Sequence, residues 1–158
     1  MKSIIKYTLF VWPLLFMMSF QKKSQDTSKV YLIALKEHVS RAEKNIGSLA
    51  ERNEFAAKTI FVINDGGIEL PEKLGSHKLQ EMGDSAFSLL QDSVGLHVIK
   101  LNPIGVFQGS ILVVLSDYVI TKRNGEATLS YAGGVEYTFN YNSQSRHYVI
   151  VREKSISF

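Results

Sequence analysis

Long runs of β-branched and aromatic residues fill the last third of the chain and predict three long antiparallel strands there. The runs cover residues 109–122, 126–141 and 146–158. Two short polar connections separate them, at residues 123–125 and 142–145. Strand formers joined by short turns are typical of an antiparallel meander. Such a sheet exposes both faces, so we expect the preceding residues to cover it.

Apolar residues recur every three or four positions between residues 29 and 49, which predicts an amphipathic helix. The chain offers several residues before position 29 that can cap its start. A second short helical segment is expected over residues 49–58. The apolar face of the first helix comprises Tyr31, Leu35, Val39, Ala42, Ile46 and Leu49.

The middle of the chain changes pattern several times. Residues 59–63 predict a short strand, and the turn formers Asn64 to Gly67 predict a hairpin that returns along residues 68–70. Ser76 can cap a helix running from His77 towards Met82, with a second helical piece over 85–93. Residues 96–101 predict the next strand, which residues 102–105 break.

This order predicts an α+β domain, in which a curved antiparallel sheet wraps around the N-terminal helices. The sheet would combine a short hairpin with a four-strand meander. Glycines in or beside long strands mark bulges and bends, so we expect the sheet to curl into a cone-like hollow. The relevant glycines are Gly105, Gly109, Gly133 and Gly134.

The first 20 residues differ in kind from the rest. A basic start is followed by an apolar run from Tyr7 to Phe20 and then by polar residues. This pattern is typical of a secretory signal peptide, because the run is shorter than the ~20 residues of a spanning helix. An uncleaved membrane anchor and a buried helix are the alternatives. The expected organisation is therefore an export segment over 1–20, a polar leader over 21–28 and one domain over 29–158, exported to the periplasm or secreted.

Charge and cysteine content narrow the possible partners. Four of the 18 basic residues precede Asp26, which leaves 18 minus 4, or 14, against 15 acidic residues, a net charge of −1. A nucleic-acid surface needs clustered bases on the domain itself, so we expect no nucleic-acid partner. The chain has no cysteine, which excludes disulfides and thiol catalysis. We expect no cofactor.

Three stretches resemble the nuclear-transport-factor-2-like superfamily, which includes ketosteroid-isomerase-like and polyketide-cyclase-like proteins. They are INDGGIELPEKLGS at 63–76, GSILVVLSDYVIT at 109–121 and VEYTFNYNSQSRHYVIVREKSIS at 135–157. With the element order, the resemblance covers about residues 29–158. The chain has Tyr148 where the family usually has a tryptophan. The resemblance implies functions that range from isomerases, dehydratases and cyclases to binding and assembly domains.

Asp117 and Tyr118 are the candidate catalytic residues. Both faces of their strand are largely apolar, and an unpaired buried carboxylate costs several kcal/mol. Asp117 should therefore be paired, protonated or near a strand end. A carboxyl in a hollow can act as a general base, whereas the structural alternative is an ion pair with Arg146 or Arg152.

Aromatic residues crowd the last strands, where core and dimer packing is the ordinary explanation and a wall for an apolar ligand is the functional alternative. The candidate ligand-binding residues are Tyr131, Tyr137, Phe139, Tyr148 and His97. The four histidines lack metal-binding spacing, so we expect no metal. The leading hypothesis is an exported, non-enzymatic domain that binds a small apolar ligand or a protein partner, with a possible homodimer through the sheet. The alternative is an isomerase, dehydratase or cyclase using a pocket carboxylate and a Tyr donor.

Overall fold

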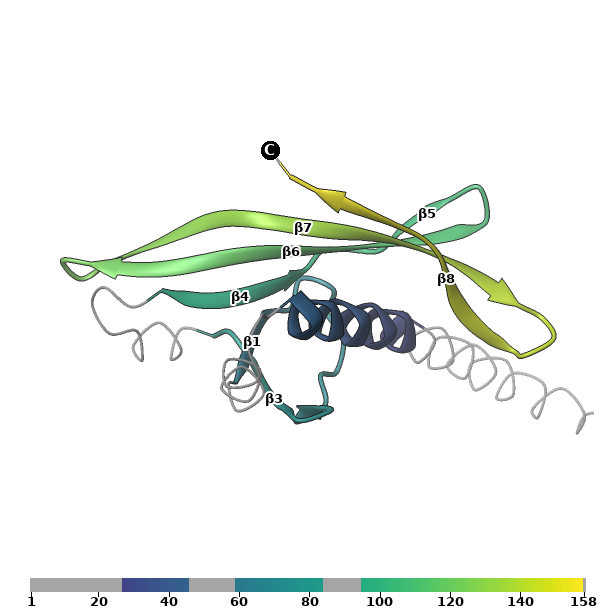
Figure 1. Cartoon of the computed structure of the whole chain (residues 1–158), viewed down its shortest axis with the longest axis horizontal. Coiled ribbons are helices and arrows are strands. Elements are labelled where there is room, and N and C mark those ends of the chain that lie inside the picture. Colours follow the sequence, from purple (N-terminus) through teal and green to yellow (C-terminus); the bar gives the residue numbers. More distant parts are fainter. Residues whose placement is uncertain (1–26, 46–58, 84–94, 158) are drawn as a thin grey trace, which may run out of the picture.

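The computed structural model describes residues 27–45, 59–83 and 95–157. Within these ranges the protein is an α+β domain with one helix, over residues 27–45, and a curved, mostly antiparallel sheet (Figure 1). The strands are β1 (Ile60–Ile63), β2 (Lys73–Leu74), β3 (His77–Glu81), β4 (Leu96–Leu101), β5 (Gly105–Phe107), β6 (Ser110–Arg123), β7 (Glu126–Asn142) and β8 (His147–Ile156).

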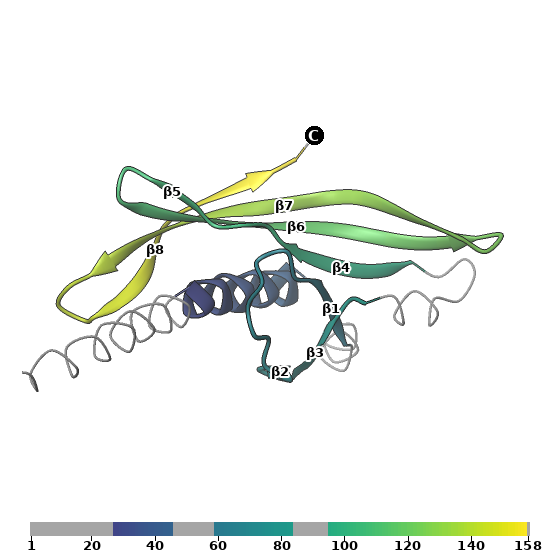
Figure 2. The ribbon, with the colours of Figure 1, turned by 180° about the vertical axis from the view of Figure 1, so that it is seen from behind.

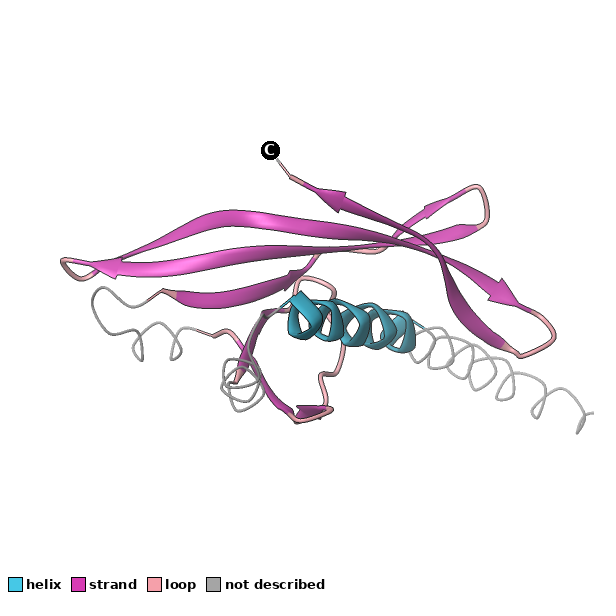
Figure 3. Ribbon diagram, viewed as in Figure 1, coloured by secondary structure: helices cyan, strands magenta, loops and turns pink. Residues whose placement is uncertain are grey.

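The predicted meander is present. Strands β4, β6, β7 and β8 are consecutive antiparallel neighbours in the sheet order β2-β3-β1-β4-β6-β7-β8. Strands β6 and β7 are the longest elements, with 14 and 17 residues, and they curve along the whole molecule (Figure 3). The sequence did not predict β5, which pairs with the start of β6.

The predicted hairpin after β1 is wrong. The turn itself forms, because the Gly67 amide donates to the Asn64 carbonyl at 3.1 Å, but residues 68–70 are not a strand. Instead β1 lies between β3 and β4 and is parallel to both. The sheet is therefore mixed, because β1 pairs in parallel with β3 and β4. It does not pair with the residues directly after its turn.

The predicted helix from His77 towards Met82 is also wrong, because this stretch is β3. Its buried residues are His77 and Leu79, two positions apart, which is the alternation of a strand. Gly75 adopts a φ of 63° in the turn that joins β2 to β3. The helices predicted over 49–58 and 85–93 and the export segment lie outside the described residues.

The helix packs on one face of the sheet (Figure 2). Tyr31, Leu35 and Val39 are buried there, as the spacing predicts. They contact a core from β1, β4, β6 and β7 that includes Leu115 and Phe139. Burying one such side chain contributes about 1.5–3 kcal/mol, so this contact is the main attachment of the helix. No helix among the described residues is long and apolar enough to span a membrane.

Candidate functional site

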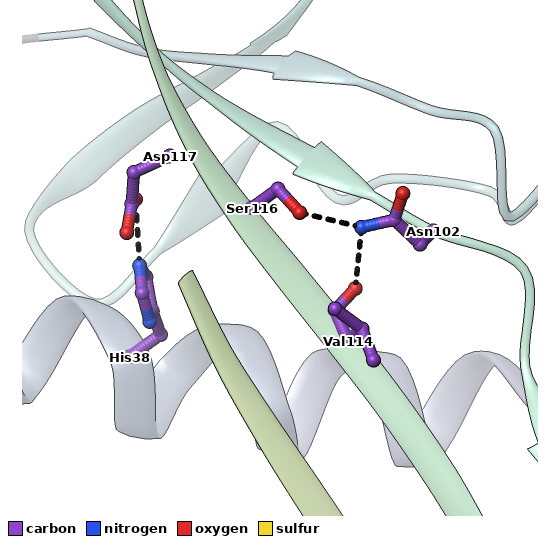
Figure 4. A network of polar contacts seen from close by, with 5 residues as sticks. All are labelled: His38, Asn102, Val114, Ser116 and Asp117. Atoms are coloured by element: carbon purple, nitrogen blue, oxygen red, sulfur yellow. Dashed lines mark hydrogen bonds and ion pairs between the residues drawn. The ribbon is translucent and has the colours of Figure 1, made fainter. Parts of the chain in front are cut away.

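The site begins with a side-chain hydrogen bond between the helix and the sheet. His38 Nε2 lies 2.8 Å from Asp117 Oδ1, across 79 residues of sequence (Figure 4). Asp117 alternates with the buried Val113 and Leu115 and so faces the helix. His38 follows Leu35 by one helical turn and so faces the sheet. When Asp117 is ionised, the Nε2–H group of His38 donates this bond.

Tyr137 lies on the same face of the sheet. It pairs in register with Val113 on β6 and is fully buried. Burial raises the pKa of its hydroxyl to about 12, with Arg41 opposing the shift and Glu37 and Asp117 adding to it. At neutral pH the group is therefore a protonated hydrogen-bond donor.

Two buried polar atoms at this site have no hydrogen-bond partner within the described part of the chain. They are the Tyr137 hydroxyl and Nδ1 of His38. When Nε2 of a neutral histidine carries the proton, Nδ1 is an acceptor. Buried polar groups are nearly always hydrogen-bonded, and each exception needs an explanation. The site thus offers one free donor and one free acceptor near a carboxylate.

An ion pair and a second histidine–carboxylate contact hold the helix against the sheet. Arg41 pairs with Glu153 on β8, which is in register with Tyr137. On the far side of the helix, Glu43 Oε1 lies 2.8 Å from Nε2 of the buried His77. These contacts fix the helix on both sides of the site, so His38 is held opposite Asp117.

A neutral hydrogen-bond network fixes the end of β4 beside the site. The side-chain amide of Asn102 donates to the Val114 carbonyl at 3.1 Å and to the Ser116 hydroxyl at 2.9 Å (Figure 4). The Tyr31 hydroxyl donates to the Asn102 carbonyl at 2.6 Å. Burial raises the pKa of Tyr31, and a backbone hydrogen bond with Ile104 offsets part of that shift.

The structure separates the two candidate catalytic residues. Asp117 faces the helix, whereas Tyr118 faces the other side of the sheet, where it stacks edge-on against Tyr131 at 5.5 Å between ring centroids. Asp117 is paired, as expected, but its partner is His38 and neither Arg146 nor Arg152. The Tyr hydroxyl on the side of Asp117 is that of Tyr137.

The predicted aromatic wall is divided by a β-bulge. Gly133 pairs with Asp117 but Tyr131 pairs with Tyr118, so Ala132 is an extra residue in β7. The bulge moves Tyr131 to the face opposite the helix, away from Tyr137. Four of the five candidate residues share the helix-facing side of the sheet: Tyr137, Phe139, Tyr148 and, by its register opposite Val119, His97.

His97 is exposed on β4, where it pairs with Val119. The spacing of the four histidines did not point to His38. The available signal for His38 was its place beside Leu35 and Val39 in the apolar stripe of the helix.

Among residues 27–45, 59–83 and 95–157, no group of three or more His, Asp or Glu side chains could hold a metal ion. In comparisons with known proteins, the chain matches no family model, no curated protein and no solved structure.

Proposed function

We propose that this domain binds a small, mostly apolar molecule between its helix and the helix-facing side of the sheet. The observation that supports this is the buried Tyr137 hydroxyl, which has no partner among the described residues. A ligand with one acceptor oxygen, such as a ketone, would receive the hydrogen bond of Tyr137. Tyr137 belongs to the hydrophobic core cluster between helix and sheet, which suits the ring or chain that carries the oxygen.

The test uses a solvatochromic naphthyl ketone, whose ring is apolar and whose carbonyl accepts one hydrogen bond. Fluorescence titration gives its Kd for the wild type, for Tyr137→Phe and for Tyr141→Phe. Tyr141 is 55% exposed, so its variant controls for the general loss of a tyrosine hydroxyl. We expect Tyr137→Phe to weaken binding about tenfold, the worth of one hydrogen bond in a buried site. Equal affinity for all three proteins would contradict the proposal.

A second candidate function is proton transfer on a bound carbonyl compound, as in an isomerase, dehydratase or cyclase. The His38–Asp117 pair beside Tyr137 favours it. Asp117 would accept a proton from the carbon next to the carbonyl group, and Tyr137 would donate a hydrogen bond to the enolate oxygen that forms. Tyr137 takes the role that the sequence suggested for Tyr118.

Deuterium exchange at the carbon beside the carbonyl of the same ketone, in heavy water, distinguishes the two functions. Catalysis predicts exchange that Asp117→Asn abolishes while the ketone still binds. If the wild type binds the ketone but catalyses no deuterium exchange, the result supports ligand binding and contradicts the catalytic function.

Several expectations from the sequence form part of the proposal. The helix and the bent sheet would enclose a cone-like cup, as the glycines in and beside the long strands predict, and the chain would resemble nuclear-transport-factor-2-like proteins. Residues 1–20 would direct export to the periplasm or outside, or anchor the chain in a membrane. Two copies could associate through the sheet face that carries Tyr118 and Tyr131, because partly exposed aromatic side chains lie there.

A further inference from the structure

Two large apolar side chains project at the turn between β5 and β6. Val106 is 74% exposed and Phe107 is 61% exposed. The turn itself is tight, because Gln108 and Gly109 both have positive φ angles, of 49° and 79°, as in hairpins with two-residue loops. A rigid hairpin thus holds an aromatic and an aliphatic side chain in solvent.

The turn between β7 and β8 lies at the same end of the sheet. The Ser110 hydroxyl at the start of β6 contacts Asn140 Oδ1 at 2.7 Å near the end of β7. Just beyond, Tyr141 and Tyr148 pair edge-to-face, with ring centroids 5.3 Å apart. Both turns lie at the same end of the long strands but diverge there, the β5–β6 turn away from the helix and the β7–β8 turn on the helix side (Figures 1 and 2). We call this region the tip end, defined by Val106, Phe107, Tyr141, Arg146 and Tyr148.

The segments that form the tip end contain no acidic residue. Residues 101–116 carry no charge at all, and residues 137–152 carry Arg146 and Arg152 without any Asp or Glu. The opposite turn, between β6 and β7, differs because it has an acidic residue beside it: Arg123 directly precedes the turn and Glu126 directly follows it. The tip end is therefore apolar and aromatic with a positive bias.

The first residue of the helix points towards the tip end. Tyr31 contacts Asn102, whose amide donates to the Val114 carbonyl, and seven residues later His38 contacts Asp117. The helix thus runs in the same direction as β6, and residue 27 lies nearer the β6 start (Figure 1). The preceding 26 residues, with the apolar run 7–20 and then Lys22 and Lys23, join the domain on this side.

We propose that the tip end docks on a lipid bilayer. Phe107 and Val106 would enter the boundary between headgroups and acyl chains, and Tyr141 and Tyr148 would lie at headgroup level, where amphipathic aromatic rings are favoured. Arg146 would face anionic headgroups, which attract basic residues near a membrane surface. A bilayer fits better than a protein partner, because the apolar run 7–20 precedes residue 27 in the sequence and residue 27 lies towards this end. This contact is separate from the ligand site between helix and sheet.

The test uses single-cysteine variants of the full chain, because the chain has no native cysteine. Gln108→Cys at the tip end is compared with Asn124→Cys at the opposite end. The two positions are matched, since each starts a two-residue turn before a glycine, with φ angles of 49° and 53°. Each cysteine carries a nitrobenzoxadiazole label. The proteins are reconstituted into three-to-one phosphatidylcholine–phosphatidylglycerol vesicles with or without lipids that bear a quencher on the acyl chain.

We expect the label at position 108 to shift its emission to shorter wavelength in vesicles and to be quenched by the lipid quencher. The label at position 124 should keep its aqueous emission and stay unquenched. Adding Val106→Ser and Phe107→Ser should abolish the shift at position 108. Because residues 1–26 are present in every variant, the loss of the shift on adding Val106→Ser and Phe107→Ser separates insertion of the tip end from tethering by the N-terminal segment.

Three results would overturn the proposal. If neither label is quenched, the tip end does not reach the lipid. If both are quenched alike, the protein adsorbs without orientation. A short-wavelength shift at position 108 that is equally large without vesicles would show that a second copy of the chain covers the tip.

Discussion

At the scale of single residues, the adjacent side chains of Asp117 and Tyr118 lie in different surroundings, on opposite faces of the sheet. Asp117 faces a histidine in the core, while Tyr118, its neighbour, faces the other side of the sheet. The sequence predicts that Asp117 needs a partner, because an unpaired buried carboxylate is costly. It could not predict which partner, since His38 is 79 residues away and only the docking of the helix brings them together.

Replacing Tyr137 by phenylalanine should stabilise the ligand-free protein. The hydroxyl is buried without a partner among the described residues, and such a group costs about 1–3 kcal/mol. Urea unfolding should therefore show a higher free energy of unfolding for Tyr137→Phe than for the wild type. Tyr141→Phe, at an exposed position, should change it by less than about 0.5 kcal/mol. A clear loss of stability in Tyr137→Phe would mean that the hydroxyl is bonded.

The raised pKa of Tyr137 also predicts how stability depends on pH. Its hydroxyl ionises near pH 10 in the unfolded chain and near pH 12 in the folded protein. Between these values the unfolded state binds fewer protons, so the free energy of unfolding falls as pH rises from 10 towards 12. The loss from this group should reach roughly 2 kcal/mol. Urea unfolding at several alkaline pH values should show a smaller loss for Tyr137→Phe.

A double-mutant cycle should detect coupling between His38 and Asp117. Truncating either residue to alanine leaves the other polar group unpaired in a half-buried site, so we expect a coupling free energy of about 1–2 kcal/mol. The pair Arg41 and Glu153 is more exposed, and its coupling should be about 0.5 kcal/mol or less. A coupling for His38 and Asp117 no larger than that of the control pair would argue against a fixed contact.

At the scale of elements, long strands were predictable and short ones were not. Strands β6, β7 and β8 match the predicted runs closely, because each carries many strand formers between clear turns. The sequence predicts a helix where β3 lies, since Ser76 and the residues after it suit a capped helix. It could not show that His77 contacts Glu43, 34 residues earlier. The turn after β1 was predictable, but the parallel pairing of β1 with β3 and β4 was not.

The bulge in β7 should tolerate no side chain at Gly134. A Cβ there would lie 2.6 Å from the Leu115 carbonyl oxygen, so Gly134→Ala must shift the backbone of β6 or β7. We expect a loss of about 1–3 kcal/mol, as for overpacked cores. At Gly105 a Cβ would meet Leu112 at an ordinary 3.5 Å, so Gly105→Ala is the control and should be nearly neutral. Similar thermal unfolding of both variants would contradict the assigned register.

At the scale of the whole molecule, the helix over residues 27–45 lies against the face of the sheet on which Asp117 and Tyr137 converge. The sequence predicted helical cover of a curved antiparallel sheet, and the described residues confirm this coarse arrangement. It did not predict the site, because the site depends on a bulge and on the angle between helix and sheet. Both are set by three-dimensional packing of residues that are distant in the chain.

The proposed site depends on the burial of Tyr137 beneath the helix, and titration of the Tyr137 hydroxyl tests this burial most directly. Tyrosinate absorbance is followed against pH for the wild type and for Tyr137→Phe under native conditions, and the difference between the curves isolates one hydroxyl. The structure predicts that this hydroxyl ionises near pH 12. Ionisation near pH 10, the ordinary value for tyrosine, would show that the helix does not cover Tyr137 and would contradict the proposed site.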